Sequence, residues 1–286
     1  MKRVASRSGF TLVELMISTG ISLLLVLGLV STYTQQRRSY KVIQQINEMD
    51  QNLRTSVDMM IRAMRNAGYG IDAYPSQVAS WFTWASGMTN YAVVTQGSGS
   101  NPDTLRLLGA FEPALATTTV ATAVGATTLT VGSGQASKFN TTSNNIIYIG
   151  QQETAKITGI SGNVLTITRS PTVSGVGLRY AYAAGTGIEL VRLYTYKIVN
   201  DPYTYPSIAH LQREDSAGSF SYAWQKMIAN GIEDLQFTMT SSSIKASVRA
   251  RTTKIDHTYL HPTYGDRYRR QTASFDAKVR RPSKTY

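Results

Sequence analysis

One apolar stretch near the N-terminus constrains the fold of this chain more than any other part of the sequence. Within residues 10–30 the only charge is Glu14, and these 21 positions (30 − 10 + 1) would form a helix about 30 Å long. That length matches the hydrocarbon thickness of a bilayer. Three basic residues precede the stretch: Lys2, Arg3 and Arg7. Because basic flanks favour the cytoplasm, we expect a single membrane span with everything after Val30 exported.

A cleaved secretory signal peptide is the main alternative for this segment. Such a signal has an apolar region of about 7 to 15 residues and ends in a small-x-small cleavage site. The run here is longer and has no Ala-x-Ala ending. A retained membrane helix is therefore the favoured interpretation.

Glu14 needs an explanation, because a carboxylate inside a membrane helix costs roughly 2.5 to 3.5 kcal/mol on insertion scales. If the chain is cut after Gly9, Phe10 gains a new ammonium group. In a helical array of subunits, Glu14 of one chain could then pair with the Phe10 amine of the next. Each group would neutralise a charge that is otherwise costly to bury.

The segment RSGFTLVEL, residues 7–15, resembles the class III signal of type IV prepilins and type II secretion pseudopilins. The resemblance implies that prepilin peptidase cleaves after Gly9 and methylates Phe10, and that Glu14 serves in subunit assembly. It also implies partners: prepilin peptidase, other minor and major pilins, the inner-membrane assembly platform, and membrane lipid before assembly. The implied location is the bacterial inner membrane with a periplasmic head, then a surface fibre or its tip.

Looser matches are spread over most of the remaining chain. They resemble minor pilins of the PilW type, with the related minor pseudopilin J of type II secretion as the alternative. In such families the subunit joins a small complex that primes fibre assembly and sits at the tip; no spacing or composition here shows a tip position by itself. The matching segments are Met49–Arg54, Ile61–Gly70, Asn101–Leu105 and Ile228–Phe237.

The helix is expected to continue far beyond the membrane. No proline occurs between Phe10 and Ala67, and from Ile43 onward apolar residues recur at steps of three or four. Gly68-Tyr69-Gly70, followed by Pro75, is a strong stop signal. We therefore predict a leader over residues 1–9, a hydrophobic helix over 10–30 and an amphipathic outer half over 31–70.

The rest of the chain, residues 71–286, reads as a β-rich head. The predicted fold class is α+β: a pilin-like long helix packed against a mainly antiparallel sheet. The predicted strands are Tyr91–Thr95, Thr104–Leu108, Thr127–Val131, Ile146–Ile149, Thr154–Ile160, Val164–Thr168, Leu178–Tyr182, Ile188–Val199, Asp234–Thr240, Lys245–Lys254 and Thr272–Arg280.

Residues 117–187 differ from their surroundings in composition. They are rich in Thr, Ser and Gly and poor in charge, yet they contain enough Ile, Leu and Val for a small core. Two interpretations stay open: an inserted small β module, which could be an adhesive or docking surface, or a plain extension of the main sheet.

Motifs for catalysis are weak. The chain has no cysteine, which excludes disulfides, thiol nucleophiles and Cys-based zinc sites. Three GxG pairs lack the third glycine of a dinucleotide loop, and His257 and His261 lack the Glu of a zincin. Glu233 and Asp234 could bind calcium, but no ligand pattern singles them out. We expect no enzyme, no cofactor and no metal.

The net charge is +12, and basic residues gather near tyrosines at the C-terminus. Such a patch can attract phosphates, so DNA or surface binding is a second function hypothesis. The simpler interpretation, which we favour, is an exposed strand face or docking onto an acidic neighbour. The patch residues are Arg267, Arg269, Arg270, Lys278, Arg280 and Arg281.

Overall fold

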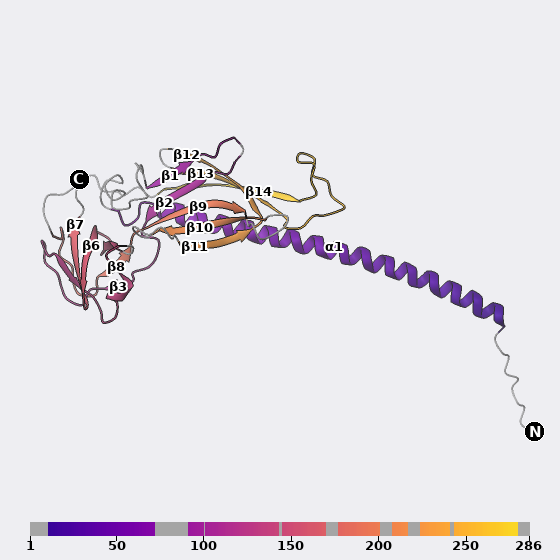
Figure 1. Ribbon diagram of the computed structural model, residues 1–286, viewed down its shortest axis with the longest axis horizontal. Coiled ribbons are helices and arrows are strands. Elements are labelled where there is room, and N and C mark those ends of the chain that lie inside the picture. Colours follow the sequence, from indigo (N-terminus) through magenta and orange to yellow (C-terminus); the bar gives the residue numbers. More distant parts are fainter. Residues whose placement is uncertain are drawn as a thin grey trace, which may run out of the picture. The chain divides into compact units, whose positions relative to one another are not determined.

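A computed structural model describes residues 11–71, 91–99, 101–142, 145–169, 177–200, 208–216, 224–240 and 243–279. One long N-terminal helix is followed by antiparallel β-sheets (Figure 1), which confirms the predicted α+β class. The chain forms two compact units, Met1–Glu48 and Met49–Tyr286.

Helix α1 (Leu12–Asn66) contains two kinds of sequence. From Leu12 to Lys41 every side chain is exposed, including the whole apolar stretch. From Met49 onward one face of the helix is buried against the sheets of the head, as its amphipathic spacing predicts. The buried helix residues are Met49, Leu53, Ser56, Met60, Ala63 and Met64.

Two glycines end the helix where the sequence predicted a stop. Gly68 and Gly70 both have φ +83°, a left-handed conformation that favours glycine. The Gly68 N–H donates to the Leu108 carbonyl at 2.9 Å, and the Ala110 N–H donates to the Tyr69 carbonyl at 2.7 Å. These bonds attach the end of the helix to strand β2 (Thr104–Gly109).

Replacing Gly70 by alanine is expected to destabilise the head by about 2 to 5 kcal/mol. The left-handed backbone costs about 1 to 2 kcal/mol for alanine, and the new Cβ would lie 2.6 Å from Ala110 Cβ, an overpacking cost of about 1 to 3 kcal/mol. Gly125→Ala is the matched control, because Gly125 also has φ +83° but nothing lies within 4 Å of its Cβ position. Urea unfolding of the full chain in detergent measures both, and equal losses would contradict the steric part.

The head contains a five-stranded and a three-stranded antiparallel sheet. The first has the order β1-β2-β9-β10-β11 and adds β1 (Ala92–Thr95), β9 (Arg192–Asn200), β10 (Ala209–Ser216) and β11 (Trp224–Asn230) to β2. The second consists of β12 (Ile232–Met239), β13 (Ser243–Arg251) and β14 (Arg270–Lys278).

A buried carboxylate joins these two sheets. Asp103, only 1% exposed, precedes β2 and accepts hydrogen bonds from the Gly97 N–H at 2.8 Å and the Phe237 N–H at 2.7 Å. The Asp103 N–H donates to the Leu235 carbonyl at 2.8 Å. The β1–β2 connection is thereby tied to β12.

The segment predicted as a possible insertion forms a sheet of its own and does not extend the five-stranded sheet. Its order is β3-β8-β5-β6-β7-β4, and Leu129, Ile147, Ile157 and Leu165 lie in its core. A short 3-10 helix, Ala136–Lys138, follows β4. The strands are β3 (Ala116–Thr117), β4 (Thr128–Thr130), β5 (Ile146–Ile149), β6 (Glu153–Ser161), β7 (Val164–Arg169) and β8 (Gly187–Leu190). We call Ala116–Leu190 the β module.

Some predicted strands were wrong. Leu178–Tyr182 is not a strand, because the N–H groups of Arg179 and Tyr180 donate to the Glu153 carboxylate instead of to a neighbouring strand. Leu178 and Tyr182 are nevertheless buried, at 2% and 5% exposure, which explains the misleading apolar pattern.

The predicted strand Ile188–Val199 is in fact two strands in different sheets. β8 belongs to the β module and β9 to the five-stranded sheet, and the Val191 N–H between them donates to the Ile146 carbonyl at 2.9 Å. Strands β10 and β11 were not predicted. β10 is highly polar, and its charges have partners within the sheet, such as Lys197 on β9 for Glu214.

Candidate functional site

The N-terminus of α1 is closed by a capping box. Glu14 Oε2 accepts hydrogen bonds from the Thr11 N–H at 2.9 Å and from the Thr11 hydroxyl at 3.0 Å. The Glu14 N–H donates back to Thr11 Oγ1 at 3.3 Å. This is the reciprocal Thr-x-x-Glu arrangement that satisfies free N–H groups at a helix start. The predicted cleavage and methylation residues, Gly9 and Phe10, lie outside the described residues.

The cap gives Glu14 a role that the sequence analysis missed, although Thr-x-x-Glu before an apolar run is a readable signature. Both bonds from Thr11 go to Oε2. Oε1 has no partner among the described residues, so it can accept a further donor, such as an ammonium group. Capping and pairing with a second chain are therefore compatible in this geometry.

Several hydroxyl groups in the exposed part of the helix are satisfied internally. The Ser18 and Thr19 hydroxyls donate to the Leu15 carbonyl at 3.0 and 2.9 Å, and Thr32 donates to the Gly28 carbonyl at 2.9 Å. Because no water is available in a bilayer core, such internal bonds lower the cost of placing hydroxyls there. The segment is suited to an apolar environment despite its Ser and Thr content.

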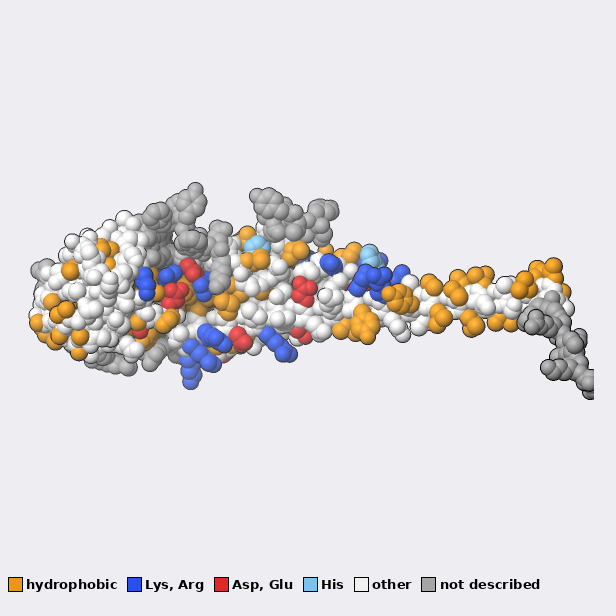
Figure 2. Space-filling view, turned by 90° about the horizontal axis from the view of Figure 1, so that it is seen from below, with side chains coloured by type: hydrophobic (Ala, Val, Ile, Leu, Met, Phe, Trp, Pro, Cys, Tyr) orange, Lys and Arg blue, Asp and Glu red, His pale blue; other side chains and the backbone are white. Residues whose placement is uncertain are grey.

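This helix carries a long exposed apolar surface, and Figure 2 shows hydrophobic side chains along its N-terminal part, at the right of the view. The large hydrophobic residues between Leu12 and Val30 are each more than half exposed. Within the described residues it is the one helix long and apolar enough to cross a membrane. A surface of this size in a folded protein marks contact with lipid or with other protein.

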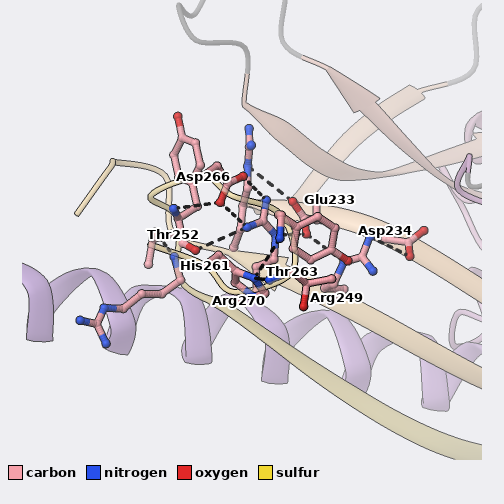
Figure 3. Close-up of polar contacts among 12 residues, drawn as sticks. Glu233, Asp234, Arg249, Thr252, His261, Thr263, Asp266 and Arg270 are labelled. Carbon is pink, nitrogen blue, oxygen red and sulfur yellow. Dashed lines mark hydrogen bonds and ion pairs between the residues drawn. The ribbon is translucent and has the colours of Figure 1, made fainter. Parts of the chain in front are cut away.

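Two residues of the predicted basic patch, Arg269 and Arg270, belong to a network of internal ion pairs, part of which Figure 3 shows. Arg270, at the start of β14, contacts both oxygens of Asp266 at 2.6 Å and Glu233 Oε1 at 2.7 Å. Arg249 on β13 contacts Glu233 at 2.8 Å and Asp234 at 3.2 Å. The arginines therefore join the β13–β14 loop, residues 252–269, to β12.

Two features strengthen this network. Arg269 donates through Nε and Nη2 to Asp256 Oδ2 at 2.9 and 2.8 Å. Guanidinium groups also lie over tyrosine rings of the loop, for example Arg270 4.2 Å from the centroid of Tyr264. The tyrosines thus stack on arginines of their own chain, which leaves less aromatic surface for nucleic-acid bases.

Two of the acidic partners, Asp256 and Asp266, are held in the charged form. The hydrogen bond from Arg270 lowers the pKa of Asp266 and outweighs its partial burial. Burial alone would raise the pKa of Asp256, but hydrogen bonds from Thr258 and Arg269 bring it below its ordinary value. At neutral pH both carboxylates are therefore ionised counter-ions of the arginines.

The network is balanced in charge, since four arginines (Arg249, Arg251, Arg269, Arg270) pair with four acids (Glu233, Asp234, Asp256, Asp266). Of the remaining predicted patch residues, Arg267 is exposed and donates to the His257 carbonyl at 2.7 Å, and Lys278 is exposed on β14. Arg280 and Arg281 lie outside the described residues. Binding of DNA or surfaces by this patch stays a prediction.

The other candidate residues have local structural roles. His261 Nδ1 accepts from the Thr263 N–H at 3.2 Å and so closes a turn of the β13–β14 loop. Glu233 and Asp234, considered above for calcium, contact Arg249 instead. The described part of the chain contains no group of three His, Cys, Asp or Glu side chains that could hold a metal ion.

Two candidate features thus emerge from the geometry: an apolar helix with exposed side chains and a capped start, and a network of paired arginines and carboxylates that joins the β13–β14 loop to β12. Comparisons of the chain with protein-family models, with curated proteins and with solved structures found no match.

Proposed function

We propose that this chain is a prepilin-like minor pilin of the PilW type, which takes part in assembly or priming of a type IV pilus. The observation that carries the proposal is the combination of the RSGFTLVEL signal, residues 7–15, with an exposed apolar helix that starts within it, at Leu12. The apolar helix would lie in lipid before assembly and among the helices of other subunits afterwards.

Assembly would use the free oxygen of Glu14. Cleavage after Gly9 leaves Phe10 as the chain end, one residue before the cap residue Thr11. The Phe10 ammonium of a neighbouring subunit would then pair with Oε1, while Oε2 keeps the cap of its own helix. The pairing lowers the cost of holding an ionised acid in apolar surroundings.

The test is mass spectrometry of the mature N-terminus in cells with and without prepilin peptidase. We expect a chain that starts at methylated Phe10 when the peptidase is present, and the intact precursor when it is absent. The variant Gly9→Val, which changes only the cleavage glycine, should remain a precursor in both. A mature chain that starts at any other residue would overturn the proposal.

A minor pseudopilin of the J type is the alternative, since type II secretion uses the same N-terminal signal. Deletion of the gene separates the two: loss of pili with normal secretion supports a pilin, and loss of secretion with normal pili supports a pseudopilin.

A further inference from the structure

A cluster of cations and tyrosines follows the apolar part of α1. Its members are Tyr33, Arg37, Arg38, Tyr40 and Lys41, which we call the interfacial collar. All five are exposed, with Tyr33 at 61% and Tyr40 at 74%. No acidic residue occurs between Glu14 and Glu48, so the three positive charges have no counter-charge nearby in the sequence.

The collar differs from the arginines of the head. Arg249, Arg269 and Arg270 each contact a carboxylate of their own chain. The collar cations form no ion pair within the described residues, and each residue of their helix segment from Ser31 to Lys41 is exposed. Three unpaired cations lie within one five-residue segment of an exposed helix, and such a concentration of positive charge attracts an anionic partner from outside the chain.

The position of the collar indicates what that partner is. At about 1.5 Å per residue, Arg37 lies roughly 10 Å beyond Val30 and Lys41 roughly 16 Å. Side chains on a helix point back toward its N-terminus, so these cations extend toward the apolar segment rather than away from it. When the apolar segment is in a bilayer, their charged ends reach the level of the phosphate groups.

The residues between the apolar segment and the collar also suit this depth. The Thr32 and Thr34 hydroxyls donate to carbonyls of their own helix at 2.9 and 2.8 Å, so neither requires water. Tyrosine is enriched at the membrane–water interface, where its ring meets the acyl chains and its hydroxyl meets water. At about 100° per residue, Tyr33, Arg37, Tyr40 and Lys41 fall within one arc of about 100°.

We infer that the interfacial collar binds the phosphate groups of anionic phospholipids in the leaflet on the head side of the membrane. The inference rests on the membrane-embedded state in the proposed function, but not on cleavage or on pilus assembly. The collar selects the lipids around the unassembled subunit and fixes the depth at which α1 leaves the bilayer.

The experiment uses the full chain reconstituted into vesicles. Because the chain has no cysteine, Gln36→Cys supplies a single labelling site beside the collar for a fluorescent probe. Vesicles contain a quencher-bearing lipid at the same mole fraction, either phosphatidylglycerol or phosphatidylcholine. Each cation near an anionic surface changes the local enrichment of anionic lipid by about fivefold. We therefore expect quenching by phosphatidylglycerol to be several-fold stronger than quenching by phosphatidylcholine, and added salt should reduce the difference.

In the variant Arg37→Gln/Arg38→Gln/Lys41→Gln, both lipids should quench the probe equally. The control Arg54→Gln/Arg62→Gln/Arg65→Gln also removes three exposed cations of α1, but from the part that follows Met49, and should behave as the parent chain. A preference for phosphatidylglycerol that survives in the collar variant would overturn the inference.

Three other results would also overturn the inference. If both lipids quench the probe equally in an inserted parent chain, the collar does not select anionic lipid, while the proposed function is unaffected. If protection of the probe from quenching depends on the protein-to-lipid ratio and not on lipid charge, the collar contacts a second copy of the chain instead of lipid. Extraction of the chain from vesicles by alkali refutes the membrane-embedded state, and with it this part of the proposed function.

Discussion

Replacing Glu14 by alanine is expected to lower incorporation of the chain into filaments at least about tenfold, while the head stays folded. A lost ion pair worth about 1.4 kcal/mol already gives that factor, and the alanine variant also loses the helix cap. The measurement is the ratio of chain in sheared filaments to chain in the membrane. Glu48→Ala removes an exposed acid from the same helix and serves as the control.

Glutamine separates the two roles of Glu14. Glu14→Gln keeps an oxygen that can accept from Thr11, so the capping box survives, but it removes the negative charge. We expect the glutamine variant to be as deficient in assembly as the alanine variant, with helix content by circular dichroism equal to that of the parent. Normal assembly of Glu14→Gln would show that capping is the whole role of this residue.

The second large effect concerns Glu153 in the β module. Glu153→Ala is expected to destabilise the module by about 3 to 5 kcal/mol. The substitution leaves buried or partly buried hydrogen-bond donors without an acceptor, at a cost of about 1 to 3 kcal/mol each. The carboxylate is 2% exposed and accepts from the Arg179 N–H at 2.9 Å and the Tyr182 hydroxyl at 2.9 Å. The Tyr180 N–H adds a longer contact at 3.3 Å.

Hydrogen exchange of the full chain locates this effect. In Glu153→Ala, amides of β5 to β7 should exchange faster, while those of β2 and β9 in the five-stranded sheet should change little. Gln152→Ala is the control, because Gln152 is the exposed neighbour of Glu153. If Glu153→Ala exchanges no faster than this control, the buried carboxylate does not hold the 177–182 segment.

The features that the sequence predicted well depend on local patterns. The apolar run, the three-to-four spacing beyond Ile43 and the Gly68–Gly70 stop all lie within one continuous segment, so helix α1 and its end could be read directly. The T-x-x-E pattern of Thr11 and Glu14 is local too and predicts the helix cap, whereas the apolar surroundings of Glu14 favour pairing between chains.

The features that were missed depend on partners distant in the sequence. Leu190, Val191 and Arg192 form one extended run without a glycine or proline, yet the sheet changes there because β8 pairs with β5 and β9 pairs with β2. The basic patch was visible as charge, but Arg270 is neutralised in part by Glu233, 37 residues earlier. Such pairings follow from the register of the folded sheet, which no short pattern encodes.

The place where the β module joins the head has a consequence for how this protein can vary. Gly109 on β2 pairs directly with Arg192 on β9, so the chain leaves the five-stranded sheet and returns to it at adjacent positions. A short turn could close that gap with the β2–β9 ladder unchanged. Another domain could therefore replace the β module, provided that it also covers the buried apolar cluster that Ile146 and Tyr148 form with Leu108.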